Sequence, residues 1–149
     1  MTNIKKAVAL VTCFTNGDKK TASSLLKENY IQHNLAYGTG RDAFLGSVEY
    51  LGSAPVKTPF KNIRAFEDGD KVVLQSVYNF AGTKDQVAFD VFRFEDGLIA
   101  EHWDNLANVA PANPSGHTQI DGDTNITPNE NTEKTREIVK NFLNDVMKG

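Results

Sequence analysis

The side chains best suited to moving protons lie in two short apolar runs between residues 87 and 108. Asp90 stands in the first run, and His102 and Asp104 stand in the second. Because alternate residues of a β-strand point to the same face, each run predicts a strand that carries these polar groups on an apolar face. Carboxylates in apolar surroundings acquire the perturbed pKa values that general acid–base catalysis needs. The apolar residues that alternate with them are Phe92, Phe94, Leu98 and Ala100.

The turn Glu95-Asp96-Gly97 decides which residues of the two runs face each other. A three-residue loop that ends in a left-handed glycine would place Asp90 opposite His102. A two-residue type I′ turn at the Asp-Gly pair would instead place Asp90 opposite Trp103. We favour the three-residue loop, because it gathers Asp90, His102 and Asp104 on one apolar face.

A second group of polar side chains occurs in the segment Tyr30-Ile31-Gln32-His33-Asn34, just after a short helical pattern. We expect this segment to leave the helix as a loop from which Tyr30, Gln32 and His33 point into a pocket. Imidazole titrates near neutral pH, so His33 is a candidate acid, base or hydrogen-bond donor. A zinc site made by His33, His102 and an aspartate would lack the usual His-x-His or His-Glu-x-x-His spacing, and we predict no metal site.

Composition and motif content argue against several classes of function. The net charge of −3 gives no reason to expect nucleic acid or an anionic membrane as a partner. Cys13 is the only cysteine, which excludes an internal disulfide and a thiolate metal cluster. The sequence has no Gly-x-Ser-x-Gly elbow and no glycine-rich phosphate loop, and Asp121-Gly122-Asp123 lacks the spaced ligands of a calcium loop. Since no stretch is long enough to span a bilayer, we predict a cytoplasmic protein.

Hydrophobic periodicity predicts an α+β fold. Helical spacing occupies residues 4–14, a short segment after residue 18, and residues 41–51, whereas strand-like runs follow from residue 58 onward. Three helices before an antiparallel sheet of about four strands are typical of helices packed on one side of a curved sheet. We assign residues 1–110 to this α+β domain, and residues 111–149, an irregular loop and a C-terminal helix, to the same single domain.

The C-terminal helix is predicted over residues 133–148, with Asn131 or Thr132 as its cap and one apolar stripe that must be buried somewhere. Its pattern is similar to that of the first helix. It is therefore either an ordinary C-terminal helix or the start of a lost second repeat.

Three sequence motifs resemble those of a known family. YIQHN after two short helices, FDVFRFEDGLIAEHWDN near the end of the sheet, and NPSGHTQIDG beyond it resemble the SnoaL-like polyketide cyclases. These belong to the ketosteroid-isomerase-like and nuclear-transport-factor-like superfamily. The resemblance implies a cone-shaped, curved antiparallel sheet with the N-terminal helices packed over a pocket, and homodimers through the outer sheet face. It departs from the family at Leu35, where proline is common.

The resemblance also implies a reaction, an intramolecular aldol condensation or a related isomerisation without metal or cofactor. The general acid–base aspartate of the family is most similar in position to Asp104, with Asp90 or His102 as its neighbour. His33, Tyr30 or His102 would then stabilise the enolate oxygen of a small apolar or aromatic carbonyl compound. The alternative is a ligand-binding or assembly module without chemistry. The residues expected to shape the pocket beside Tyr30 and Gln32 are Phe44, Tyr78, Phe92, Phe94 and Trp103.

The opposite sheet face is expected to mediate the homodimer. Val91, Ile99 and Trp103 would form an apolar surface there, around an opposite-charge pair of Arg93 and Glu101.

Overall fold

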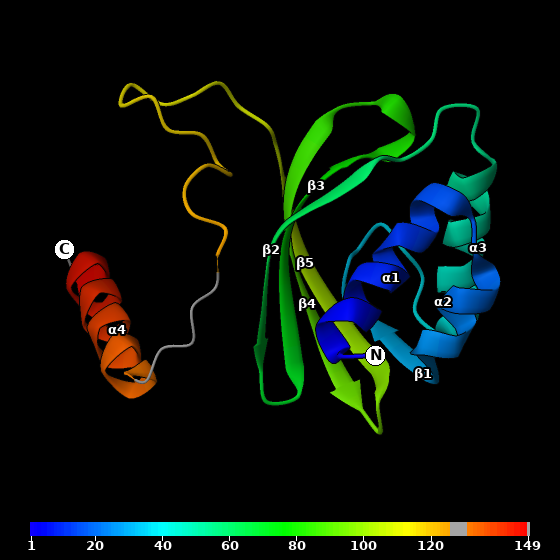
Figure 1. Ribbon diagram of the computed structural model, residues 1–149, viewed down its shortest axis with the longest axis horizontal. Coiled ribbons are helices and arrows are strands. Elements are labelled where there is room, and N and C mark those ends of the chain that lie inside the picture. Colours follow the sequence, from blue (N-terminus) through cyan, green and yellow to red (C-terminus); the bar gives the residue numbers. More distant parts are fainter. Residues whose placement is uncertain (126–130, 149) are drawn as a thin grey trace.

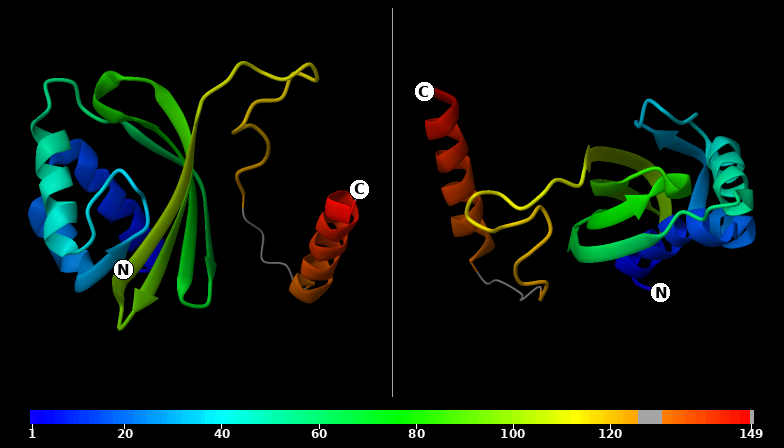
Figure 2. Two further views of the ribbon diagram at one scale, coloured as in Figure 1. Left: turned by 180° about the vertical axis from the view of Figure 1, so that it is seen from behind. Right: turned by 90° about the horizontal axis from the view of Figure 1, so that it is seen from above.

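The computed structural model describes residues 1–125 and 131–148. Two helices and one strand are followed by a third α-helix and then by four more strands, which complete a five-stranded sheet, and a further α-helix follows after a long irregular segment (Figure 1). The first three helices cover one face of the curved sheet, as two further views show (Figure 2). This architecture confirms the predicted α+β class.

The first three helices begin and end close to the predicted positions. α1 (Asn3–Asn16) starts behind Thr2, whose hydroxyl accepts a backbone N–H of the first turn. α2 (Lys19–Leu25) is capped in the same way by the Asp18 carboxylate. α3 (Arg41–Ser53) closes the layer of helices that covers the sheet.

The ends of α1 and α3 meet through two glycines. A Cβ atom on Gly52 would lie 2.3 Å from the Cα of Gly17, so any side chain at position 52 would force the two helices apart. This contact fixes the spacing of the two helices that close the pocket described below.

The sheet has the strand order β1-β5-β4-β3-β2. β1 runs parallel to β5, whereas the other neighbouring strands are antiparallel. The strands are β1 (Leu26–Gln32), β2 (Phe60–Asp68), β3 (Lys71–Asn79), β4 (Asp85–Glu95) and β5 (Leu98–Asn108).

The strand β1 corrects two predictions. The segment from residue 28 to 34 was expected to be a helix exit and a loop, and the sheet was expected to have about four strands. Instead β1 is an edge strand in which only Leu26 and Tyr30 are buried. Because its other residues are mostly polar and exposed, the strand carries too little alternation to be recognised, and its partner β5 is distant in sequence.

The hairpin of β4 and β5 turns at Asp96-Gly97, not through the three-residue loop that we favoured. Both residues have a positive φ, 53° and 76°, as a type I′ turn requires. Glu95 accordingly faces Leu98.

A β-bulge at Ala100 then shifts the pairing by one residue, because this residue has no partner on β4. Beyond the bulge Asp90 faces Asp104, and His102 faces Phe92, so the predicted pairing of Asp90 with His102 is wrong. The favoured register and the observed one differ by two residues, which is one full alternation. The three polar side chains therefore still share the inner face, as predicted.

The hydrophobic core lies between the helices and the inner face of the sheet. Ile99 belongs to this core with no exposed surface, which corrects its predicted place on the outer face, since the two-residue turn pairs it with the inward Phe94. Phe94 is also a core residue. The largest fully buried side chains include Tyr30, Phe92, Leu10, Leu26 and Leu74.

The irregular segment after β5 is tied to the outer face of the sheet through two side chains. Arg64 donates from Nε to the backbone oxygen of Asp123 at 2.9 Å, and Gln75 Nε2 donates to that of Gln119 at 3.0 Å. The amphipathic helix α4 (Thr132–Lys148) follows where the sequence predicts it, and all of its residues are exposed. Its place in the same single domain stays a prediction.

Among the described residues, we find no helix that combines the length and the apolar character needed to cross a membrane.

Candidate active site

A cavity lies between the inner face of the sheet and the helices α1 and α3. Its volume is about 30 Å³, more than the roughly 10–15 Å³ that one water molecule needs. Aromatic and aliphatic side chains form most of its wall, and a small set of polar side chains points into it. The lining residues are Val11, Phe14, Gln32, Tyr37, Gly38, Phe44, Ser47, Tyr78, Phe80, Asp90, Phe92, His102, Asp104 and Leu106.

Asp90 and His102 form a buried pair on the cavity wall. The distance from His102 Nε2 to Asp90 Oδ1 is 3.0 Å, and both side chains are less than 10% exposed. Tyr78 donates its hydroxyl to the other carboxylate oxygen of Asp90 at 2.7 Å. Burial, and then the nearby charge of Asp90, raises the pKa of Tyr78 far above its ordinary value, so this phenol remains a donor.

Asp104 lies on the same face and is held by Asn34. The Asn34 amide donates from Nδ2 to Asp104 Oδ2 at 2.7 Å, while its own oxygen accepts the backbone N–H of Ala36 at 2.8 Å. The second oxygen of Asp104 has no hydrogen-bond partner within residues 1–125 and 131–148. Asp104 is therefore a carboxylate with one oxygen available to a ligand.

The three groups lie close enough to act on one small molecule. One ligand atom from each of Asp90, His102 and Asp104 lies within 4.8 Å of the others, a spacing that would also fit a metal ion. The imidazole nitrogen and one Asp90 oxygen already face each other at hydrogen-bond distance. Groups of these types at this spacing can transfer protons to and from a small molecule.

Two tyrosines stand near Asp104 in different settings. Tyr30 is almost fully buried, and its hydroxyl accepts a hydrogen bond from Gln32 Nε2 at 3.0 Å. Tyr37 lines the cavity, and its hydroxyl has no hydrogen-bond partner in the described part of the chain. Burial first, and the charge of Asp104 second, raise the pKa of both phenols. Tyr37 therefore offers an O–H that is free to bind a ligand oxygen.

Rings of the cavity wall hold the catalytic candidates in place. Phe92 stacks on the imidazole of His102 with a centroid distance of 4.6 Å. Phe14 packs against Phe44 at 4.9 Å, and Tyr78 stacks on Phe80 at 5.1 Å. These apolar contacts keep bulk water away from the polar cluster.

His33 and Trp103 lie on the outer face of the sheet, which corrects their predicted place in the pocket. His33 bonds through Nε2 to Glu101 at 2.8 Å and stacks on Trp103 at a centroid distance of 4.9 Å. Residues 32, 33 and 34 alternate across the sheet, so His33 points away from the side that Gln32 and Asn34 occupy. The conceivable zinc set of His33, His102 and an aspartate is therefore not assembled.

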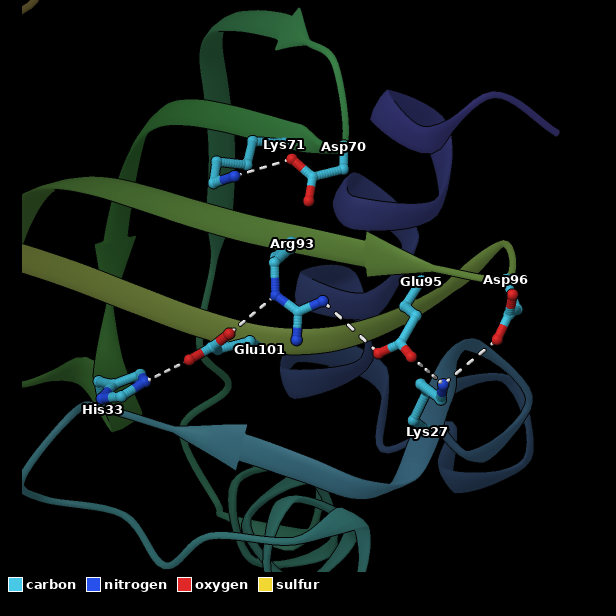
Figure 3. A network of polar contacts seen from close by, with 8 residues as sticks. All are labelled: Lys27, His33, Asp70, Lys71, Arg93, Glu95, Asp96 and Glu101. Carbon is cyan, nitrogen blue, oxygen red and sulfur yellow. Dashed lines mark hydrogen bonds and ion pairs between the residues drawn. The ribbon is translucent and has the colours of Figure 1, made fainter.

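The outer face also carries the predicted ion pair. Arg93 donates from Nε to Glu101 at 2.8 Å, and the chain of charges continues from Arg93 through Glu95 to Lys27 (Figure 3). Two other expected pocket residues lie behind the wall: Phe94 in the core and Tyr30 beneath Gln32. The predicted wall residues Phe44, Tyr78 and Phe92 do line the cavity.

Several residues of the candidate site were not predicted. Tyr37 and Gly38 come from the loop between β1 and α3, and loop side chains carry no periodic signal. Ser47 could have been found, because it lies one helical turn after Phe44 on the same side of α3. Asn34 stands in the same polar motif as Gln32 and could have been named with it.

Comparison with known proteins agrees with the observed fold. The family model described as a SnoaL-like domain matches residues 7–102, well over half of the chain. The chain belongs to the SnoaL-like family. The matched part of this SnoaL-like chain contains Asp90 and His102 and ends two residues before Asp104. A comparison with curated proteins finds no match.

Solved structures show the same fold for this SnoaL-like chain. An NTF2-like protein of unknown function from Cytophaga hutchinsonii has a TM-score of 0.62 at 18% identity, covering 72% of this chain and 91% of its own. A LEH-like epoxide hydrolase from M. tuberculosis has a TM-score of 0.60 at 18% identity, with coverages of 70% and 81%. A hypothetical protein with a ketosteroid isomerase-like fold from Catenulispora acidiphila, in complex with trimethylamine, has a TM-score of 0.57 at 19% identity, with coverages of 70% and 86%.

Proposed function

We propose that this SnoaL-like protein is an acid–base enzyme that needs no cofactor and acts on a small neutral carbonyl compound, in an aldol-type cyclisation or an isomerisation. One observation carries the proposal: the available Asp104 carboxylate lies beside the hydrogen-bonded pair of Asp90 and His102 in a small cavity with an aromatic wall. A proton acceptor and a proton-holding pair on one wall are the two elements that enolisation needs. We expect the enzyme to act in the cytoplasm.

Asp104 is the general base in this mechanism. Its carboxylate takes a proton from the carbon next to the carbonyl, the C–H electrons form a carbon–carbon double bond, and the carbonyl electrons move to oxygen. The Tyr37 hydroxyl donates a hydrogen bond to that oxygen, and the pair of Asp90 and His102 supplies the proton that completes the enol. The enol carbon then either attacks a second carbonyl carbon, whose oxygen takes the proton from Asp104, or recovers the proton from Asp104 itself. In both cases the enol oxygen returns its proton to the pair of Asp90 and His102 and becomes a carbonyl again.

The decisive experiment measures exchange of α-protons by NMR in deuterated water, over a panel of small neutral carbonyl compounds. Replacing Asp104 by Asn keeps shape and polarity but removes the base, so exchange should fall by roughly 100- to 10,000-fold. Replacing Tyr37 by Phe should lower exchange by about 100- to 1000-fold, the usual cost of losing a donor to an oxyanion. Asp68→Asn, at the exposed end of β2, is the matched control and should leave exchange unchanged.

Exchange that survives Asp104→Asn would contradict the assignment of the base. If no carbonyl compound exchanges at all while ligands still bind, the binding module becomes the better explanation.

A specific observation supports a second candidate, the hydrolysis of an epoxide. The cavity can hold a water molecule beside Asp104, and one protein of the same fold is described as an epoxide hydrolase. Asp104 would then activate the water, and the pair of Asp90 and His102 would protonate the opening oxygen. Diol formation from a panel of small epoxides, with Asp104→Asn as the inactive variant, distinguishes this reaction from enolisation.

We also propose that the protein is a homodimer through the outer face of the sheet. Phe66 and Phe89 are 41% and 49% exposed there, near Val91 and Trp103. Apolar side chains gathered on one face are typical of a surface that another protein covers.

A further inference from the structure

The side chain of Gln32 reaches the pocket from the end of β1, and its orientation is fixed by a neighbour that can only donate. The backbone N–H of Asn34 lies 3.0 Å from Oε1 of Gln32. A backbone N–H cannot accept a hydrogen bond, so the atom of Gln32 that faces it must be the oxygen. The amide nitrogen of Gln32 then donates to the hydroxyl of Tyr30.

This orientation determines the state of one ring nitrogen of His102. Nδ1 of His102 lies 2.9 Å from the same Oε1 of Gln32. Because that oxygen can only accept, Nδ1 must carry a hydrogen. In a neutral imidazole the other nitrogen, Nε2, is then the bare one.

Nε2 of His102 faces Asp90 Oδ1 at 3.0 Å, and a bare nitrogen facing a carboxylate oxygen would be repulsive. A proton between the two atoms removes the repulsion, either as imidazolium with carboxylate or as imidazole with carboxylic acid. Tyr78 donates to the other oxygen of Asp90 and leaves Oδ1 to this contact. The pair of His102 and Asp90 therefore holds two protons. One is on Nδ1 of His102, and the other lies between Nε2 of His102 and Oδ1 of Asp90.

We propose that Gln32 is a positioning residue that holds His102 in the Nδ1–H form and thereby keeps a mobile proton between His102 Nε2 and Asp90 Oδ1. Gln32 acts through His102, and it deepens the proposed function by giving the pair of Asp90 and His102 its role as proton donor. The expected effect of Gln32 on turnover rests on the proposed function, whereas the position of the protons on His102 does not. The ionisable groups around the His102 ring are Asp90 from β4, Tyr78 from β3, Tyr30 from β1, Asp104 from β5 and Tyr37 from the loop before α3.

The test reads the proton positions directly in the full-length protein labelled with ¹⁵N. Long-range ¹H–¹⁵N correlation spectra separate protonated from bare ring nitrogens, and the chain has only three histidines. His33→Gln and His117→Gln assign the two exposed rings, which lie outside the pocket. We expect Nδ1 of His102 to stay protonated from about pH 5 to about pH 9, across the range in which histidine ordinarily titrates.

Two substitutions of Gln32 should move this proton in opposite ways. Gln32→Leu removes the acceptor, so neutral His102 should switch to the Nε2–H form and donate to the Asp90 carboxylate. Gln32→Glu keeps an acceptor and adds a negative charge, so both ring nitrogens should stay protonated to a higher pH. Gln75→Leu is the matched control, because Gln75 is a hydrogen-bonded glutamine of the same sheet that lies outside the cavity.

A native spectrum with a bare Nδ1 would overturn the proposal, and it needs no variant to fold. An unchanged form of His102 in Gln32→Leu would also overturn it. With a substrate in hand, Gln32→Leu should lower kcat more than it changes KM, and Gln32→Glu should shift the kcat profile to higher pH. If the spectra behave as expected while Asp104→Asn keeps full proton exchange, the role of Gln32 stands and the proposed function falls.

Discussion

Replacing Tyr78 by Phe tests how strongly the buried cluster depends on a single hydroxyl. Tyr78 is 3% exposed and donates to Asp90, which is 4% exposed, over 2.7 Å. The ring itself stacks on Phe80 and packs against Phe60, and both contacts remain available to phenylalanine. The substitution therefore removes one hydrogen bond and leaves the apolar packing nearly intact.

The size of the effect depends on the charge of its partner. A hydrogen bond to an ionised group contributes about 1.5–3 kcal/mol to the free energy of unfolding, and a neutral one about 0.5–1.5 kcal/mol. The short distance between Tyr78 and Asp90 is typical of a phenol bound to a carboxylate. We therefore expect a loss of about 1.5–3 kcal/mol, which in a chain of this size lowers the melting temperature by roughly 3–12 °C.

Urea and thermal unfolding followed by circular dichroism measure this loss. Tyr50→Phe is the control, because Tyr50 is 74% exposed, and such surface substitutions stay within about 0.5 kcal/mol. A double-mutant cycle with Asp90→Ala should return a coupling of about 1–3 kcal/mol between the two side chains. A loss for Tyr78→Phe no larger than that for Tyr50→Phe would refute the reasoning, and a coupling near zero would do the same.

Three further outcomes follow from the outer face and the core. Sedimentation at micromolar concentration should show a dimer, and Trp103→Glu should shift it toward monomer; a native protein that sediments only as monomer contradicts the proposed interface. Hydrogen bonds from His33 and then Arg93 lower the pKa of Glu101 below its ordinary 4.5, so the stability that this carboxylate contributes is present above pH 4.5 and is lost as the pH falls through the lowered pKa. Glu101→Gln should therefore flatten the loss of melting temperature in this acidic range. An equal loss in both proteins would count against this role of Glu101. Burial, and then the charge of Asp18, raises the pKa of Cys13 to about 11, so a thiol reagent at about pH 8 should react only as fast as the protein unfolds, and rapid labelling of the folded protein would disprove this.

The helices and strands in which apolar residues recur at regular spacing could be predicted from the sequence. The three N-terminal helices, the hairpin strands and the C-terminal helix all show a continuous apolar pattern, and caps such as Thr2 and Asp18 mark their starts. The strand β1 could not be predicted, because Lys27, Glu28 and Asn29 break its pattern and its stabilising partner is distant in sequence.

The candidate site was predicted in part, because the error in the strand register was an even number of residues. The inward direction of Asp90, His102 and Asp104 depends only on whether the register is odd or even, so an error of two residues left it correct. The misplacement of His33 has a similar origin. A residue in an assumed loop has no defined face, and only the pairing of β1 with β5 sends His33 outward while Gln32 and Asn34 point inward. Tyr37 lies beyond such reasoning, since only the path of the loop after β1 brings it over Asp104.

The bulge at Ala100 bears on how this site could change over time. In a strand with strict alternation, one inserted or deleted residue exchanges every side chain beyond it between the two faces of the sheet. Ala100 is the one residue at this point without a partner on β4, so deleting it would remove the bulge and still leave His102 opposite Phe92 and Asp104 opposite Asp90. The hairpin should therefore tolerate the loss of one residue at the bulge with His102 and Asp104 still facing the cavity, whereas a deletion that shifts the paired residues should abolish the chemistry before it abolishes the fold.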